Sequence, residues 1–155
     1  LSFDGVNDDV IVNFKQRNKV LKISEIKPKL LKKGKDITIV GLGYGTKIGT
    51  EVAQNLQKNG YSSDLIDLRI LNPLKLNSVV NSVKKTKKIV VIDPGWKNCS
   101  VSSEIIAHIN DNLDLGFKSM RCNIFFSPAP TAKNLEKFYY MKTKNITQKI
   151  KLKFF

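Results

Sequence analysis

Short apolar runs alternate along the chain with amphipathic stretches of helical length. The run "DITIVGL" at residues 36–42 is almost continuously apolar and rich in β-branched residues, which is typical of a parallel strand covered on both faces. Further runs of strand length occupy residues 63–71, 87–93 and 119–126. Because right-handed crossovers return each strand to the same sheet, this order predicts a mostly parallel sheet between helices.

The stretches between these runs carry apolar residues at helical spacing. The first predicted helix is capped by Thr46 and ends at Asn59-Gly60, where glycine tolerates a left-handed conformation. A second is expected after Pro73, and a third from about Ser100, with the hydroxyls of Ser100, Ser102 and Ser103 as candidate caps. A short helix is expected within 127–140, and a last amphipathic helix follows. The apolar stripes are Ile48, Val52 and Leu56; Leu76, Val79, Val80 and Val83; Ile105, Ile106, Ile109 and Leu113; and Ile146, Ile150 and Phe154.

The domain organisation follows from the length and from where the periodicity starts. A chain of 155 residues suits one domain with a tail. Residues 1–35 have no sustained period and contain Pro28, so we expect a basic arm or linker from a preceding domain, with at most a short edge strand, and an α/β domain over 36–155. Since no signal-peptide pattern follows Leu1, we expect a fragment of a longer protein that is not secreted. The chain also contains no apolar run long enough to cross a bilayer.

The charge is strongly positive and bears on partners. Lysine and arginine number 27 against 13 acidic residues, a formal net charge of +14. Such a charge attracts phosphates and acidic surfaces over long range. The lysines occur singly and in short runs without interleaved aromatic residues, so a solvated lysine-rich surface is favoured over a nucleic-acid adaptor.

The residue types that usually carry chemistry are scarce. Cys99 and Cys122 lack the spacing of a metal site or a disulfide framework, and a buried or unreactive thiol is expected at each. His108 is the single histidine and lies beside an apolar stripe, as a boundary histidine would. With no nucleophile and base in a recognisable arrangement, we expect no catalytic residue in this chain and no unaided catalysis.

The glycine turn "GLGYGT" follows a strand and opens a helix. Gly41, Gly43 and Gly45 could let backbone amides approach a phosphate, and Asp67 could then accept a ribose hydroxyl. The spacing is G-x-G-x-G, however, and matches neither dinucleotide nor P-loop patterns. A turn that makes room between strand and helix is therefore favoured, and a stand-alone nucleotide-binding or regulatory α/β module is the alternative.

Two further pairs of residues stand at strand ends. Asp67 and Arg69 lie two residues apart on a predicted strand and so share a face, which predicts an ion pair at a sheet edge. Asp93 and Trp96 follow the third predicted strand, where the carboxyl ends of parallel strands open toward ligands and partners. They are the better functional candidates, although a capping aspartate and an anchoring tryptophan are equally in keeping with the pattern.

An ordered set of motifs carries a family resemblance. The segments "KPKLLKKGKDITIVGLGYGT", "DLRILNPL", "SVKKTKKIVVIDPGW", "SEIIAHI" and "SPAPTAKNLEKFY" occur in this order over about residues 27–150. Together they resemble the C-terminal domain of the transketolase superfamily, with the greatest likeness to the beta subunits of pyruvate and other 2-oxo acid dehydrogenases. The resemblance implies a three-layer α/β/α sandwich with a mostly parallel five-stranded sheet.

The same resemblance implies a function for the parent protein. Its enzyme would use thiamine diphosphate and Mg²⁺, but the activating glutamate and the GDG motif of that family lie in other segments, so this chain alone would bind neither cofactor. The domain would serve subunit association in a homo- or hetero-oligomer of alpha and beta subunits, a dimer in the simplest case, and docking of a lipoyl acyltransferase. A cytoplasmic or organellar-matrix location would follow.

Three residues match the family's motif positions. Asp93 matches an acidic residue after the third strand, Trp96 the tryptophan of pyruvate-type beta subunits, and Glu104 the glutamate that opens the next helix. They are the candidate docking or interface residues. The family's "PLD" ends in Lys75 here, and serines and Asn98 replace glycines in the following loop, which predicts altered loop contacts. The charge of +14 would repel a basic acyltransferase domain and favours an acidic partner or a relative outside the large complex.

Overall fold

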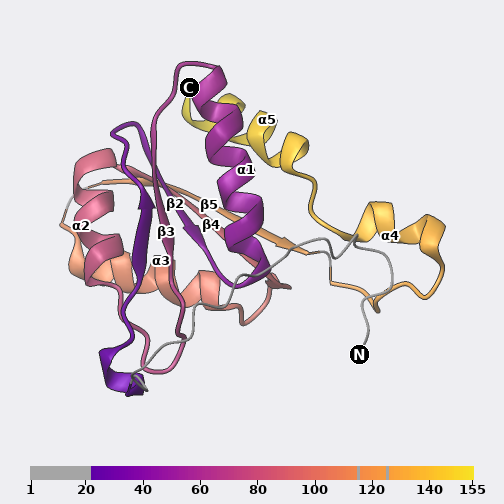
Figure 1. Cartoon of the computed structure of the whole chain (residues 1–155), viewed down its shortest axis with the longest axis horizontal. Helices are drawn as coiled ribbons and strands as arrows, with labels where there is room; N and C mark the ends of the chain where they lie inside the picture. The colour runs from indigo at the N-terminus through magenta and orange to yellow at the C-terminus, as the bar shows by residue number, and fades with distance from the viewer. Residues whose placement is uncertain (1–21, 115, 125) are drawn as a thin grey trace, which may run out of the picture.

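Five strands form one sheet in the computed structural model of the chain, which describes residues 22–114, 116–124 and 126–155 (Figure 1). The strand order is β1-β3-β2-β4-β5. The edge strand β1 runs antiparallel to β3, and all other neighbours are parallel. The strands are β1 Lys29–Lys32, β2 Ile37–Gly41, β3 Ser63–Asp67, β4 Lys88–Trp96 and β5 Lys118–Ile124.

Helices cover both faces of this sheet (Figure 1). α1 (Tyr44–Lys58) and α5 (Thr143–Phe154) pack on one face around a buried cluster that includes Val52 and Ile150. α2 (Asn77–Thr86) and α3 (Val101–Asn112) pack on the other around a cluster that includes Val79 and Ile105. The three-layer α/β/α sandwich with a mostly parallel five-stranded sheet is therefore confirmed.

Two short helices complete the described chain. The 3-10 helix η1 (Ile23–Glu25) precedes β1, and α4 (Lys133–Tyr139) extends away from the sandwich (Figure 1). α4 buries none of its own residues. Within the described residues, the helices are all too short or too polar to cross a lipid bilayer.

The apolar stripes and one of the helix caps behave as predicted. Ile146, Ile150 and Phe154 are all buried on α5, as their four-residue spacing requires. Ser100 occupies the N-cap of α3, and its hydroxyl accepts a hydrogen bond of 3.3 Å from the Ser103 amide. Thr46 does not cap α1, because Gly43 takes the N-cap position and Thr46 lies inside the first turn, where its hydroxyl donates to Asp67.

The predicted ion pair between Asp67 and Arg69 is wrong. β3 ends at Asp67, four residues before the predicted end, and Arg69 has a left-handed φ of 63° beyond it. The two residues therefore do not share a strand face, and only the Arg69 backbone amide, at 3.3 Å, reaches the Asp67 carboxylate. β3 also lies between β1 and β2, so its end is not at the sheet edge.

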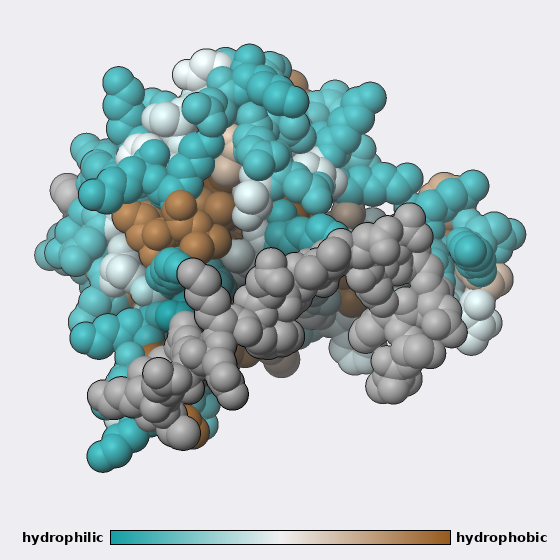
Figure 2. All heavy atoms as spheres, in the orientation of Figure 1, coloured by the Kyte–Doolittle hydropathy of each residue, from teal (hydrophilic) through white to brown (hydrophobic). Residues whose placement is uncertain are grey.

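The basic N-terminal segment contains the short edge strand that the sequence allowed. β1 pairs with β3 with an irregularity between Leu30 and Lys32, so this part of the arm is joined to the sheet. Leu30 and Leu31 remain about two-fifths exposed. Figure 2 shows a hydrophobic patch over this strand within a largely hydrophilic face. The rest of the arm, residues 1–21, lies outside the described residues, and the division at residues 35 and 36 stays a prediction.

A buried polar cluster lies under α2 at the amino end of the sheet. The Thr38 hydroxyl is 2.7 Å from both the Ser82 and the Thr86 hydroxyls, and Ser82 donates to the Asp64 carboxylate at 2.6 Å. Lys85 forms an ion pair of 2.6 Å with the same carboxylate. Burial by itself raises the pKa of Asp64, but hydrogen bonds from Lys85, Ser82 and the Gly34 amide outweigh it and hold the pKa below its usual value.

Candidate functional site

The sheet reverses its winding between β2 and β4, and this is where open α/β sheets place their sites. α1 follows β2 on one face, whereas α2 leads into β4 on the other. Ligands of such folds bind at the carboxyl ends of the strands beside this switch point. In this chain the switch point brings together the glycine turn after β2 and the Pro94-Gly95-Trp96 segment at the end of β4.

The glycine turn is packed against β4. A Cβ added at Gly45 would lie 2.2 Å from the carbonyl oxygen of Ile92, and one at Gly41 would lie 2.5 Å from the Cα of Thr46. Both glycines therefore serve a close approach of helix to strand, which is the packing interpretation of the turn. Gly43 has a φ of 51° and open space around it, so its absent side chain relieves backbone strain. At Gly41 and Gly45 the backbone approaches protein atoms, which favours the packing interpretation over a phosphate site.

Asp93 holds the loop after β4. Its side chain is buried, and its two carboxylate oxygens accept hydrogen bonds from the Gly95 amide at 2.9 Å and the Ser102 amide at 3.0 Å. The Ser102 amide belongs to the first turn of α3, where a negative charge is favoured by the unpaired amides of the helix end. Asp93 thus links the end of β4 to the start of α3, with both of its carboxylate oxygens bonded to backbone amides.

Two side chains of β5 brace the same loop. The Asn123 amide nitrogen donates to the Asp93 carbonyl at 3.3 Å and to the Ser102 hydroxyl at 3.1 Å. The Arg121 guanidinium donates to the Ser103 hydroxyl and to the Lys97 carbonyl. Neither residue was predicted as part of the site, although their alternation with Met120 and Cys122 along the strand indicates a shared polar face. The loop is therefore fixed by β4, α3 and β5 together.

This bracing leaves an aromatic pair exposed to solvent. Trp96 is 49% exposed and Phe126 is 62% exposed. Their rings meet edge to face with centroids 4.9 Å apart. Trp96 at the end of β4 pairs with Ile124 at the end of β5, and Phe126 follows two residues later. Glu104 is exposed in the first turn of α3. Of the three sequence candidates, Asp93 is turned inward, while Trp96 and Glu104 face outward.

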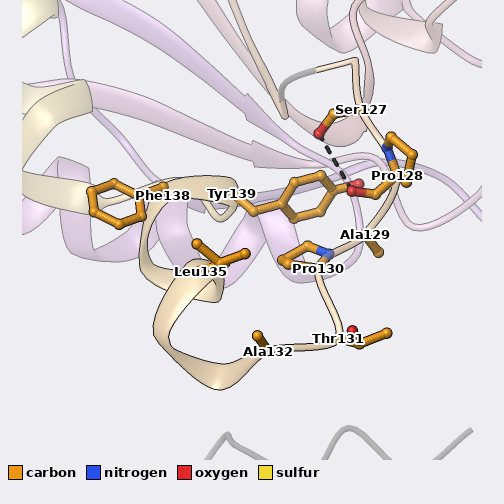
Figure 3. A pocket seen from close by; sticks show the side chains of 9 residues that line it. All are labelled: Ser127, Pro128, Ala129, Pro130, Thr131, Ala132, Leu135, Phe138 and Tyr139. Atoms are coloured by element: carbon orange, nitrogen blue, oxygen red, sulfur yellow. Dashed lines mark hydrogen bonds between the residues drawn. The ribbon is translucent and has the colours of Figure 1, made fainter.

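Further apolar side chains are exposed in the segment after β5. Pro128, Pro130, Leu135 and Tyr139 help to line a hollow of about 450 Å³ between the proline turn and α4. In Figure 3 the Tyr139 ring points toward Pro128, whereas Phe138 points away from it. Leu135 is 50% exposed and Phe138 is 75% exposed. We call the exposed residues Trp96, Phe126, Leu135 and Phe138 the aromatic surface.

His108 and the two cysteines complete the titratable candidates. His108 is half-buried and, with Lys84 and three asparagines, lines a separate hollow between α2 and α3. Cys99 is exposed, whereas Cys122 is buried in β5 and its burial raises the pKa of its thiol to about 11. Among the described residues, no three His, Cys, Asp or Glu side chains are grouped closely enough to hold a metal ion.

Comparison with known proteins identifies the family. The model of the transketolase C-terminal domain matches residues 27–146. The chain is 36% identical over 129 residues to the mitochondrial pyruvate dehydrogenase E1 component subunit beta of Dictyostelium discoideum, covering 81% of this chain and 36% of that protein. It is 37% identical over 111 residues to the mitochondrial subunit of the same name from Ascaris suum, covering 70% of this chain and 31% of that protein.

A further relative and a solved structure extend the comparison. The beta subunit of an acetoin:2,6-dichlorophenolindophenol oxidoreductase from Cupriavidus necator is 30% identical over 115 residues, covering 71% of this chain and 33% of that subunit. The solved structure of a split gene transketolase, described as an inactive beta4 tetramer, superposes with a TM-score of 0.70 at 22% identity, covering 83% of this chain and 42% of that one. The chain thus spans about a third of the length of the curated relatives it matches. On the match over residues 27–146, the chain belongs to the transketolase C-terminal domain family.

Proposed function

We propose that this chain is the C-terminal domain of a 2-oxo acid dehydrogenase beta subunit and that its task is subunit association and partner docking. The observation that carries this proposal is the aromatic surface, whose Trp96–Phe126 pair lies beside the braced loop at the carboxyl ends of β4 and β5, while Leu135 and Phe138 lie on α4. Exposed aromatic and apolar residues of this kind mark protein interfaces. Trp96 and Phe126 would form the centre of contact, and Glu104 would lie at its polar rim.

The parent enzyme would use thiamine diphosphate with Mg²⁺ to decarboxylate a 2-oxo acid. The close approach of Gly45 to the Ile92 carbonyl oxygen favours a packing role for the glycine turn, and the described part of the chain has no cluster of three His, Cys, Asp or Glu side chains. The cofactor would therefore be held by other segments or by an alpha subunit. This domain would contribute the surface on which subunits, and a lipoyl acyltransferase, assemble.

The location of the parent follows from the same relatives. Two of the beta subunits similar to this chain are named as mitochondrial. We infer an organellar matrix as the working location.

An antibody against this domain tests the proposal in the source cell. We expect it to detect a polypeptide at least about twice as long as this chain, since the parent would carry further domains. The precipitate should contain a second subunit and should decarboxylate a 2-oxo acid only when thiamine diphosphate is supplied. A native product of the length of this chain, without a second subunit, would contradict the proposal.

A further inference from the structure

A group of lysines, all exposed except the half-buried Lys88, gathers at the amino end of the sheet, opposite the aromatic surface. They come from the ends of α1, α2 and α5 and from the starts of β4 and β5. In Figure 1 the ends of α1 and α5 lie side by side at the top of the view, and Figure 2 shows a hydrophilic surface there. We call Lys58, Lys84, Lys87, Lys88, Lys118 and Lys151 the basic end.

Strand pairing and side-chain contacts connect most of these lysines. Lys88 and Lys118 are partners in the register of β4 and β5, and the Lys118 amide donates to the Lys87 carbonyl at 3.0 Å. The Lys88 ammonium lies 4.2 Å from the centroid of the Phe155 ring, which stacks on Tyr61 at 3.8 Å just beyond the end of α1.

The far side of the basic end is connected in the same way. The Lys151 ammonium donates to the Asn59 side chain at 2.8 Å, and Asn59 directly follows Lys58. The positive charges of α1, α5, β4 and β5 therefore lie around the Tyr61–Phe155 pair.

Nearby carboxylates offset only part of this charge. In the described part of the chain, the one lysine–carboxylate pair within 4.0 Å is Lys85 with Asp64. Asp36, the other carboxylate at the strand starts, accepts hydrogen bonds from the Ser62 amide and hydroxyl, and attraction from Lys88 adds a smaller contribution to its lowered pKa. Asp111 and Asp114 are exposed around the end of α3, without a lysine at ion-pair distance in the described residues. None of the six lysines of the basic end thus has a carboxylate within 4.0 Å among the described residues.

Helix stabilisation explains only part of this arrangement. Lys58, Lys84 and Lys151 stand in the last turns of their helices, where a positive charge offsets the negative end of the helix dipole. Lys87, Lys88 and Lys118 are outside helices, and two of them are neighbours across a strand pair. Like charges side by side on neighbouring strands lower stability. An external anion would offset that repulsion.

The chemistry of the surface favours carboxylates over nucleic acid. The two arginines among the described residues, Arg69 and Arg121, lie elsewhere, so the bidentate phosphate contacts typical of arginine are not offered here. The Phe155 ring is covered by Tyr61 on one side and approached by Lys88, which leaves little room for a stacked base. Flexible lysines on several elements suit carboxylates spaced along a chain.

We propose that the basic end docks an acidic polypeptide segment, rich in Asp and Glu, from another protein. Electrostatic attraction would guide this segment to the surface, and its carboxylates would pair with Lys87, Lys88 and Lys118. The proposal does not rest on the beta-subunit assignment, because the aromatic surface lies at the opposite end of the sheet.

Fluorescence anisotropy of the full chain with labelled oligoglutamate tests the proposal. The test variant carries Lys87→Glu and Lys118→Glu, and the matched control carries Lys133→Glu and Lys137→Glu on α4, with the same change in net charge. We expect the test variant to weaken binding about tenfold or more and the control less than about threefold, because the close charges dominate over those beyond a Debye length.

Circular dichroism checks that both variants fold, and Lys→Gln at the same positions replaces any variant that does not. Oligothymidylate of equal charge and vesicles containing phosphatidylserine serve as rival polyanions. Equal losses in the test and control variants, absence of saturable oligoglutamate binding, or tighter binding of either rival would overturn the proposal. Selective loss in the test variant with oligoglutamate as the tightest ligand would support it.

Discussion

The two ends of the sheet use their polar residues in opposite ways. At the carboxyl end, Asp93 accepts a hydrogen bond from the Ser102 amide, and Asn123 donates one to the Asp93 carbonyl. These bonds fix the loop beside which Trp96 stays exposed to solvent. At the amino end, Asp64 is buried under α2, where it pairs with Lys85 and accepts a hydrogen bond from Ser82, and the lysines of the basic end lie at the same end of the sheet. The comparison shows that a buried carboxylate can either shape a surface loop or support the core, depending on whether its partners are backbone amides or side chains.

The largest effect is expected where the carboxyl end is most tightly packed. Gly45→Val would place a side chain against the Ile92 carbonyl oxygen, which is 2.2 Å from the Cβ position, and should lower the free energy of unfolding by about 3 kcal/mol or more. Urea denaturation measures this. Gly116→Ala, where the Cβ meets open space, is the control and should change stability by less than about 0.5 kcal/mol. Similar losses in both variants would mean that the glycine turn is not closely packed against β4.

The second largest loss of stability is expected at Asp93, and its size tests whether this carboxylate stabilises the loop or binds a partner. Asp93→Ala leaves the Gly95 and Ser102 amides without their acceptor and should lower the free energy of unfolding by about 2–3 kcal/mol. Asp93→Asn keeps one amide oxygen as an acceptor and should cost roughly half as much. Thermal unfolding followed by circular dichroism compares the two. Unchanged stability in Asp93→Ala would return Asp93 to the list of partner-binding candidates.

A pH titration examines the carboxylate at the amino end. The folded pKa of Asp64 is lowered, so its ionised form stabilises the fold at pH values above the unfolded pKa of about 3.9. That stability should be lost as the pH falls from about 4 through the lower folded pKa. Asp64→Asn should therefore show a flatter dependence of unfolding free energy on pH in this range.

Urea midpoints of both proteins between about pH 2 and pH 6 give this difference. Asp36→Asn is the comparison variant, since Asp36 accepts hydrogen bonds from Ser62 but lies nearer the surface. Parallel pH curves for the wild-type chain and Asp64→Asn would show that the ion pair with Lys85 does not stabilise the ionised carboxylate.

The smallest effect on stability is expected at the aromatic surface. Trp96→Ala removes a side chain that is 49% exposed and should lower the free energy of unfolding by less than about 1 kcal/mol. Its effect on association should be larger, about tenfold or more in Kd, because aromatic residues at interface centres carry much of the binding energy. Sedimentation of the parent protein with its second subunit measures this. A stability loss as large as that of Asp93→Ala would assign Trp96 to the fold instead.

Prediction from sequence worked best where periodicity decides structure. The run at residues 36–42 and the stripe Ile146, Ile150 and Phe154 needed only the spacing of apolar residues, and both lie in the predicted elements and are largely buried. The predicted helix cap at Thr46 was wrong, because Gly43 occupies the N-cap of α1. The predicted strand through Arg69 was also wrong, because β3 ends at Asp67 and Arg69 has a left-handed φ. Both errors concern local backbone conformation, which residue type constrains only weakly.

The candidate site was predictable only in outline. The position after a parallel strand pointed to Asp93 and Trp96, but their opposite orientations depend on Ser102 and Asn123, which are distant in sequence or on another element. The Asp64 cluster was missed because Thr38, Ser82 and Thr86 interrupt apolar patterns singly and become one cluster only when α2 lies over β2 and β3.

Residue order and composition are enough to predict the alternation of strands and helices, the apolar faces that form both cores, and the excess of lysine. These follow from hydrophobic periodicity and composition, which act through neighbouring residues along the chain. The folded arrangement is needed to show which polar groups meet, which aromatic residues remain exposed, and that Lys87, Lys88 and Lys118 lie together at one end. Hydrogen bonds and ion pairs require contact within a few ångströms, and the crossovers of the sheet, not the sequence separation, set those distances.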